Sequence, residues 1–418
     1  MSLLTAIRRE FAFLLKQNVT VALILSAALL SSFAVWSGLS ETAEQNAAIE
    51  RLLEADAADR AAAISKEVDY GGAAYYAFHL TYDPPSALAF AALGERDVRP
   101  WKHRIRMLAL EGQIYETDAG NAELAHSGRF DFAFVISVLA PLFLIILLHD
   151  QRASERAAGR HDLLAATAGS DHAPWRARAG VRVAGLTLAL LAPFWVGAMI
   201  AGVSLHAAIL VTLIATLLIV FWTAICLWAS ARRVSGPAIA SSLLAVWVLT
   251  TFVIPALGDA AIRTAVPAPK GGDIILAQRE KVNDAWDIPK EATMDPFLER
   301  HPEWADHADI NRPFEWKWYY AFQQVGDQSV EEMSLKRREA VAARNEAAGW
   351  VALLSPAGLT ERALTRAART DAKAAFAYQE SVRAFHASLR AFHYPLLFGS
   401  EPYDEARFDS LPEYKPSF

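Results

Sequence analysis

The chain has 418 residues, of which 54% are hydrophobic and 21% are charged, and its formal net charge is −6. Its mean hydropathy of +0.19 is high for a soluble protein, but it has too many charged residues to be buried entirely in lipid. This composition predicts membrane spans combined with large water-exposed parts. The acidic balance gives no support to a nucleic-acid partner, and a single cysteine, Cys226, excludes a disulfide bond within the chain.

The first eighteen residues have the pattern of an amphipathic helix. Apolar residues recur there at helical spacing, with basic residues around them. We therefore expect an interfacial helix at the cytoplasmic membrane surface, the alternative being a simple extension of the first span. The apolar residues are Leu3, Leu4, Ile7, Phe11, Leu14 and Leu15, and the basic ones are Arg8, Arg9 and Lys16.

Five uncharged apolar runs cover residues 19–39, 132–148, 183–203, 207–229 and 236–257. Each has about the length that a helix needs to cross some 30 Å of hydrocarbon, and a helix satisfies its own backbone groups in lipid. We predict five transmembrane helices; the alternative is a set of buried helices in a large soluble enzyme. Pro141 and Pro193 are expected to kink their helices, and Pro255 to end the fifth.

The short connections set the expected orientation. Basic residues concentrate before the first span, in the link after the second span and in the link after the fourth, whereas residues 204–206 have none. Positive charge marks the cytoplasmic side. The N-terminus is therefore expected in the cytoplasm, and the two long polar segments are expected outside it.

The expected fold is an all-α polytopic membrane protein with a mainly helical extracytoplasmic domain. Residues 1–39 form the interfacial helix and first span, and residues 40–130 form the first extracytoplasmic insert. Residues 131–257 contain spans two to five with a cytoplasmic link at 150–182, and residues 258–418 form the second insert. Within the inserts, helices are predicted at 41–68, 331–354 and 371–392, and the inserts are expected to join into one domain.

Catalytic and nucleotide-binding motifs are missing. The chain has no phosphate-binding loop, no Gly-x-Ser-x-Gly and no His-Glu-x-x-His, and no span has a clearly central ionisable residue. A cluster of His301, Glu303, His307 and Asp309 favours a solvated surface turn, with a zinc site as the alternative. The aromatic run 316–320 is expected to pack in a core or at an interface.

The arginine-rich link resembles the cytoplasmic coupling helix of type-2 ABC permeases. That helix often reads Glu-Arg/Lys-x-x-Gly-Thr-Leu followed by a leucine pair. This chain has Glu155-Arg156-Ala157-Ala158-Gly159 and then Asp162-Leu163-Leu164, with Arg160-His161 in the place of Thr-Leu. The resemblance implies that Glu155, Arg156, Gly159, Arg160, Leu163 and Leu164 couple the chain to an ATPase.

The rest of the chain is similar to a subfamily of these permeases with two large extracytoplasmic inserts. The second insert of that subfamily contains an aromatic run and a Ser-Pro-Ala segment, here 317–322 and 355–357. The resemblance implies a dimer of ABC ATPase subunits holding ATP and Mg, and a second permease chain, identical or a sister. It also implies that the chain lies in the lipid of a bacterial inner membrane, and it leaves open a periplasmic protein as a further partner. No catalytic residue, metal ligand or cofactor is expected in this chain.

Six spans are usual in that family, but the residues after Phe392 are polar. Either this member has five spans and an outside C-terminus, or the sixth span is absent from this sequence. Two other functions stay open: a membrane-anchored enzyme, or a sensor or scaffold, with its working site in the extracytoplasmic domain.

Overall fold

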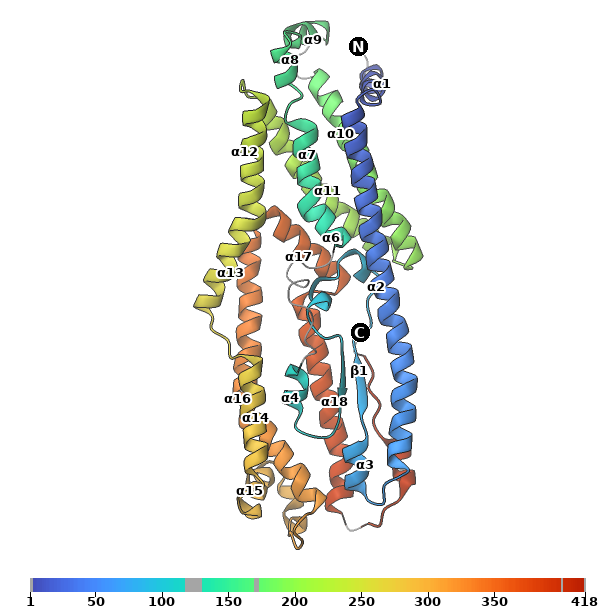
Figure 1. Ribbon diagram of the computed structural model, residues 1–418, viewed down its shortest axis with the longest axis vertical. Helices are drawn as coiled ribbons and strands as arrows, with labels where there is room; N and C mark the ends of the chain where they lie inside the picture. Colours follow the sequence, from blue (N-terminus) through green and yellow to red (C-terminus); the bar gives the residue numbers. More distant parts are fainter. Residues whose placement is uncertain (1–2, 117–129, 169–172, 400, 417–418) are drawn as a thin grey trace.

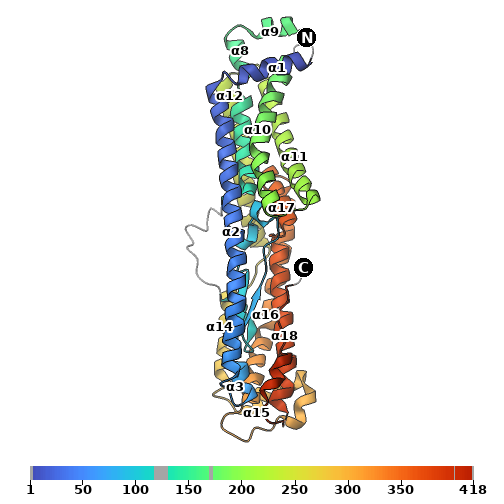
Figure 2. The same ribbon diagram turned by 90° about the vertical axis from the view of Figure 1, so that its right-hand side faces the viewer.

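The computed structural model describes residues 3–116, 130–168, 173–399 and 401–416. The molecule is long, narrow and mostly helical (Figure 1). One end, which we call the hairpin end, carries α1 (Leu3–Leu14), α8 (Ala153–Ala157) and α9 (His161–Ala168). A turn at Leu15 and Lys16 separates α1 from α2, and Figure 2 shows α1 lying across this end. The alternative that α1 merely extends the first span is therefore wrong.

Five helices among the described residues are long and apolar enough to cross a membrane, as expected of a membrane-spanning protein. Each overlaps one of the five apolar runs, and we call these helices the span bundle. The third starts well before residue 183, because Arg176, Arg178 and Arg182 suit a helix although they do not suit hydrocarbon. The five cover Asn18–Ile64 (α2), Phe132–Ala157 (α6, η3, α7 and α8), Ala173–Ile200 (α10), Leu205–Ser230 (α11) and Gly236–Ala265 (α12, η4 and α13).

Two prolines of the span helices stand just after a π-helical segment. Pro141 is the second residue of α7 (Ala140–Leu148), which follows η3 (Val135–Leu139), and Pro255 is the second residue of α13 (Ile254–Ala265), which follows η4 (Leu249–Val253). Proline lacks an N–H and its ring crowds the carbonyl one turn earlier, and a wider turn accommodates both effects. The expectation that Pro255 ends the fifth helix was wrong, because α13 continues to Ala265.

Helix α2 runs without interruption from the span bundle into the other half of the molecule. It has 47 residues, which at 1.5 Å per residue gives a length of about 70 Å. The sequence had suggested a span at 19–39 and a separate helix at 41–68. The two are one helix because no proline separates them and the residues after 40 are rich in alanine and glutamate.

Beyond the span bundle, the second half of α2, residues 65–116 and residues 266–416 pack together, and we call this the distal region. Helix α4 lies against α14 and α16, and α18 lies against α3. The segment after the first span and the segment after the fifth span therefore form one body. Its other elements are α3 (Tyr70–Tyr76), η1 (Ala89–Ala91), η2 (Gly94–Asp97), α4 (Leu110–Tyr115), α14 (Gly271–Asp284), α15 (Lys290–Arg300), η5 (Pro302–His307), α16 (Trp316–Ala352), α17 (Pro356–Ala368), α18 (Ala372–Phe398) and η6 (Glu405–Ser410).

The distal region also contains a small antiparallel sheet. Strand β1 (His79–Tyr82) pairs with β2 (Lys102–Ile105), so that His79 faces Ile105 and Tyr82 faces Lys102. The fold is thus mostly helical rather than entirely so. Each strand has only four residues, too few for a period-two pattern to stand out in the sequence.

The aromatic run at the start of α16 packs into a core of the distal region. Trp318 and Tyr320 are almost fully buried. The Trp318 indole N–H donates to the Thr293 hydroxyl at 2.7 Å, and the Tyr320 hydroxyl donates to the Gly71 carbonyl at 2.9 Å. The prediction of core packing is confirmed for these residues.

The distal region is joined to the span bundle by close packing around Phe90 in η1. A Cβ atom at Gly38 of α2 would lie 1.9 Å from the Phe90 carbonyl oxygen, and one at Gly197 of α10 would lie 2.8 Å from its ring. The Phe90 ring also lies 6.0 Å from that of Phe194. Only glycine leaves room for this approach, so the two halves are packed together as well as connected by the chain.

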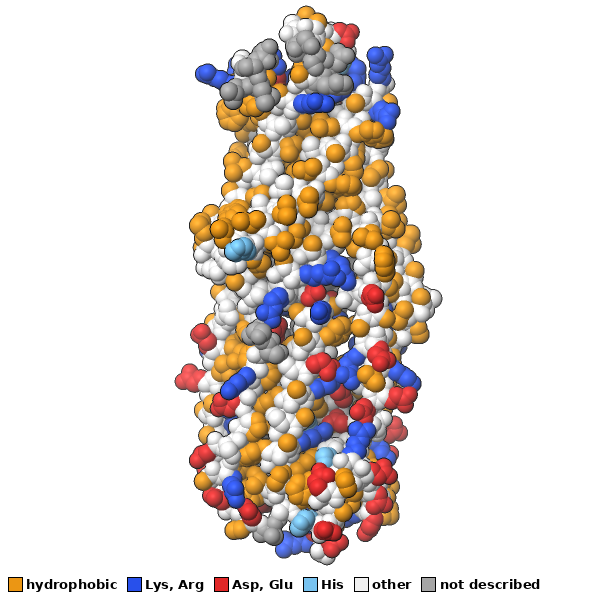
Figure 3. Space-filling view, turned by 180° about the vertical axis from the view of Figure 1, so that it is seen from behind, with side chains coloured by type: hydrophobic (Ala, Val, Ile, Leu, Met, Phe, Trp, Pro, Cys, Tyr) orange, Lys and Arg blue, Asp and Glu red, His pale blue; other side chains and the backbone are white. Residues whose placement is uncertain are grey.

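The surface divides in the same way. In Figure 3 an apolar band covers the span bundle, Lys and Arg side chains gather at the hairpin end, and side chains of both charges cover the distal region. The apolar band is what five lipid-facing helices require.

Candidate functional site

The predicted coupling residues lie in a helical hairpin at the hairpin end. Helices α8 and α9 are joined at Gly159, whose φ angle is +68°. Its amide donates to the Arg156 carbonyl at 3.0 Å, and the Arg160 amide donates to the Glu155 carbonyl at 2.9 Å. Glycine adopts this left-handed conformation at little cost and commonly ends helices. The spacing Glu-Arg-x-x-Gly therefore has a local structural basis.

A chain of ion pairs ties the hairpin to two other helices. Arg178 of α10 donates to Glu155 and to Glu10 of α1, both at 3.1 Å. Arg160 also donates to Glu155, at 2.8 Å, and Arg9 donates to Glu10 at 2.9 Å. The Glu155 and Glu10 side chains are only 9% and 5% exposed, so these charges hold α1, α8 and α10 together.

Five of the six predicted residues fall into two groups. Glu155 is internal, and Arg156 donates to the Arg232 carbonyl after α11 at 2.7 Å, so both attach the hairpin to the span bundle. Gly159, Arg160 and Leu163 are exposed, with 65% of Leu163 accessible. Leu164 is half-buried. The exposed group, not Glu155, offers a surface to another protein.

Arg160 and His161, which stand in the place of Thr-Leu, have partners of their own. Arg160 binds Glu155, and the His161 ring stacks on Trp175 with 5.1 Å between centroids. The end of the link at 169–172 lies outside the described residues.

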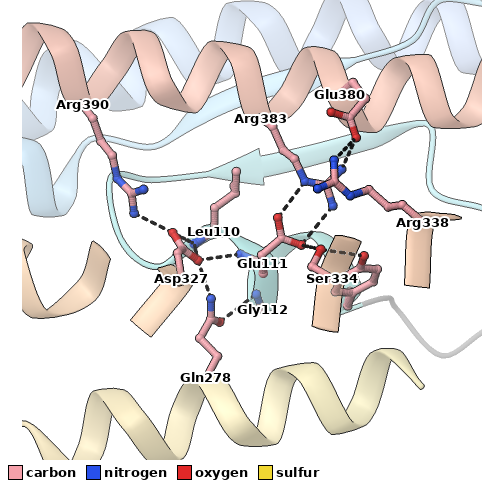
Figure 4. Close-up of polar contacts among 11 residues, drawn as sticks. Leu110, Glu111, Gly112, Gln278, Asp327, Ser334, Arg338, Glu380, Arg383 and Arg390 are labelled. Carbon is pink, nitrogen blue, oxygen red and sulfur yellow. Dashed lines mark hydrogen bonds and ion pairs between the residues drawn. The ribbon is translucent and has the colours of Figure 1, made fainter. Parts of the chain in front are cut away.

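A second site, which sequence reasoning missed, is a groove of about 580 Å³ in the distal region. It lies between one face of α16 and one face of α18, with the first turn of α4 beside them (Figure 4). We call it the distal groove. Its charged and polar lining includes Glu111, Arg300, Glu303, Gln328, Asp327, Glu331, Ser334, Arg338, Arg383, His386 and Arg390.

Asp327 of α16 joins four segments at the wall of the distal groove. Its carboxylate accepts from the amides of Leu110 and Glu111 at 2.7 and 3.0 Å. It also accepts from Gln278 of α14 at 2.5 Å and from Arg390 of α18 at 2.6 Å. Burial raises the pKa of Asp327, and Arg390 opposes that rise. This carboxylate therefore fixes α4 against α14 and α18.

Glu111 forms the second charged centre of the distal groove. Arg383 grips both of its oxygens, from Nε at 2.7 Å and from a terminal nitrogen at 3.0 Å, and the Ser334 hydroxyl donates at 2.7 Å. Burial alone would raise the pKa of Glu111, but the bonds from Arg383 and Ser334 outweigh it and hold the pKa below its usual value. Glu111 and Arg383 are thus a charged, bidentate pair.

The acidic and histidine cluster at 301–309 makes local contacts. The His301 Nδ1 atom lies 2.9 Å from Glu303, and its Nε2 atom lies 2.7 Å from Gln324, while His307 and Asp309 are exposed. Within the described residues, no group of three or more His, Cys, Asp or Glu side chains is placed to hold a metal ion.

The comparisons with known proteins concern the distal region. Residues 274–417 match the model of a domain of unknown function, DUF3526, which covers 144 of the 418 residues. The match includes α16 and α18 and therefore both helical faces of the distal groove. No curated protein and no solved structure matches the chain.

The match and the fold together define the class of protein to which the chain belongs. The chain is a mostly helical protein with five helices able to cross a membrane, and its C-terminal third is similar to DUF3526. The groove residues carried one sequence signal that could have been used. Asp327, Glu331, Ser334 and Arg338 recur at helical spacing, as do Arg383, His386 and Arg390, so each set marks a polar stripe on a helix.

Proposed function

We propose that this chain is the permease subunit of an ATP-driven transporter of the type-2 ABC family, with the α8–α9 hairpin as the contact for a separate ATPase. The observation that carries the proposal is the hairpin itself. Its tip exposes Gly159, Arg160 and Leu163, and its base is fixed to α1 and α10 through Glu155 and Arg178. A rigid base with an exposed tip is what a moving ATPase needs to displace membrane helices.

Transmission toward the distal region is supported by the helices that leave the hairpin end. Arg178 connects the hairpin to α10, and α10 packs along α2. Helix α2 then continues into the distal region as one 47-residue rod. In the proposed orientation the hairpin end is cytoplasmic, because basic residues gather there, and the distal region is extracytoplasmic, where it acts on or exports a substrate.

The proposed complex contains two ATPase subunits, which supply ATP and Mg, and a second permease chain, identical or a sister. The membrane is a bacterial inner membrane. The chain's own contribution is to bind the ATPase and to transmit its movement.

The test is co-purification of an ATPase with the chain from its native membrane in mild detergent. We expect Leu163→Asp to lower the amount of bound ATPase at least tenfold, because it places a charge on an exposed apolar contact residue. Leu335→Asp is the matched control, because Leu335 is an exposed leucine on α16 in the distal region. Equal amounts of ATPase with both variants, or none with the native chain, would overturn the proposal.

A further inference from the structure

The distal groove has the dimensions of a small-molecule site. Its volume of about 580 Å³ lies within the range of roughly 300–1,000 Å³ that is common for ligand pockets. We propose that the distal groove binds a small molecule carrying an anionic oxygen group, a carboxylate or a phosphate, on a compact planar or apolar body. This inference does not depend on the ATPase contact at the hairpin end.

The acceptors inside the distal groove are already used. The Asp327 carboxylate receives donors from Leu110, Glu111, Gln278 and Arg390. The Glu111 carboxylate receives two from Arg383 and one from Ser334. A carboxylate accepts about four hydrogen bonds, so neither acid has much capacity left for a ligand.

The donors are not used up. A guanidinium has five N–H groups, yet among the described residues the Arg390 side chain donates one hydrogen bond, to Asp327, and Arg338 donates one, to Glu380. In addition, the Arg338 Nε and Gln328 Nε2 atoms are buried without a partner in the described part of the chain. All these residues line the distal groove.

Hydrogen-bonding capacity, rather than net charge, therefore selects the ligand. The charges nearly balance, because each arginine of the groove faces an acid, and Arg338 and Arg383 share the half-exposed Glu380. Unpartnered buried donors carry a desolvation cost that a ligand acceptor removes. An anionic oxygen does this best, since bonds from guanidinium to an anion are charge-assisted.

Another part of the distal groove lining is suited to the body of the ligand. Trp304 and Tyr394 lie there, and Ala387, Ala391 and Pro395 form the α18 wall. Tyr394 is held in place because its hydroxyl donates to Gln324. Aromatic and small apolar side chains favour a planar or compact apolar group.

The first experiment compares probes of matched shape on the full chain in detergent micelles, with ligand-observed NMR giving dissociation constants. Benzoate and phenyl phosphate are the two anionic probes, benzamide is the neutral one and benzylamine is the cation. We expect at least one anionic probe to bind ten times more tightly than benzamide, and benzylamine to bind most weakly. Tighter binding of benzoate indicates a carboxylate ligand, and tighter binding of phenyl phosphate indicates a phosphate ligand.

Two pairs of variants locate the binding. Ala387→Trp fills the distal groove and is expected to abolish binding of the anionic probe, whereas Ala384→Trp, exposed on the same helix but outside the groove lining, is expected to retain it. Gln328→Glu replaces a donor by an acceptor and is expected to weaken binding about tenfold, with Gln379→Glu as the control of equal charge.

Either of two results would overturn the proposal. Both anionic probes could bind no better than benzamide, or Ala387→Trp could leave their affinity equal to that of Ala384→Trp. The Ala384→Trp chain also controls for partitioning of the probes into micelles, because the micelle is the same in both samples.

Discussion

Glu155 lies at the centre of the chain of ion pairs at the hairpin end. It accepts from Arg178 on one side and from Arg160 on the other, and its side chain is 9% exposed. A buried charge that loses its partner is costly, although the intact pair adds little to stability. Glu155 therefore acts on the stability of the hairpin end more than on partner binding.

We expect Glu155→Gln to lower the stability of the chain in detergent by about 3 kcal/mol, because Arg178 then keeps only Glu10 as a charged partner. Thermal unfolding followed by tryptophan fluorescence measures this change. Glu332→Gln is the control, since the Glu332–Lys336 pair is exposed on α16 and exposed pairs contribute little to stability. Equal midpoints for the two variants would contradict a structural role for Glu155.

At the scale of elements, Asp327 shows how a single side chain fixes a short helix. Helix α4 has six residues, too few to be stable alone. Its first amides are satisfied by Asp327 of α16 and by Gln278 of α14, whose side-chain oxygen accepts from Gly112 at 2.8 Å. The position of α4 is therefore imposed by its neighbours.

Asp327→Asn replaces one carboxylate oxygen by an amide group that meets the donors of Leu110, Glu111 or Arg390. We expect a loss of about 2 kcal/mol and faster hydrogen exchange at the Leu110 and Glu111 amides, which mass spectrometry resolves. Asp295→Asn, exposed on α15, is the control. Unchanged exchange at α4 in the Asp327 variant would show that α4 is held by other contacts.

The arrangement of helices also explains which features could be predicted from the sequence and which could not. The five apolar runs located five helices because lipid demands long uncharged segments. The Glu-Arg-x-x-Gly resemblance predicted a coupling helix in this link, whereas the structure has two short helices, because Gly159 adopts a positive φ and ends the first of them. The distal groove was missed because Glu111, Asp327 and Arg383 are far apart in the chain, and only the packing of α4, α16 and α18 brings them together.

At the scale of the whole molecule, the distal region buries several histidines in neutral form. Burial lowers the pKa of His79 in β1 to about 3, with smaller effects of Arg60 and His393, and it lowers that of His393 in α18 to about 3. Burial, with the charge of Arg383, lowers the pKa of His103 in β2 to about 4. These residues join the sheet to α18, so their protonation affects the distal region as a unit.

The unfolded chain binds protons at these histidines near pH 6.5, whereas the folded chain does so only near pH 3 to 4. Stability is therefore undiminished above pH 6.5 and falls as the pH drops below it. At pH 5.5 each of these histidines lowers the free energy of unfolding by about 1 kcal/mol. Thermal unfolding between pH 5 and 8 should show a midpoint that is flat above pH 6.5 and decreases below it.

His393→Phe tests the cause of this acid sensitivity. His393 is fully buried, and neither of its ring nitrogens has a partner among the described residues, so phenylalanine removes a titrating group from an apolar site. Because His386 is also buried with a lowered pKa, His393 is one of four such histidines. We expect the variant to be at least as stable as the native chain at pH 7.5 and to lose about a quarter of the decrease between pH 6.5 and 5.5. The control His307→Phe changes an exposed histidine of η5 and should leave the decrease intact. If both variants lose stability with acid as steeply as the native chain, buried histidines are not what limits the distal region at low pH.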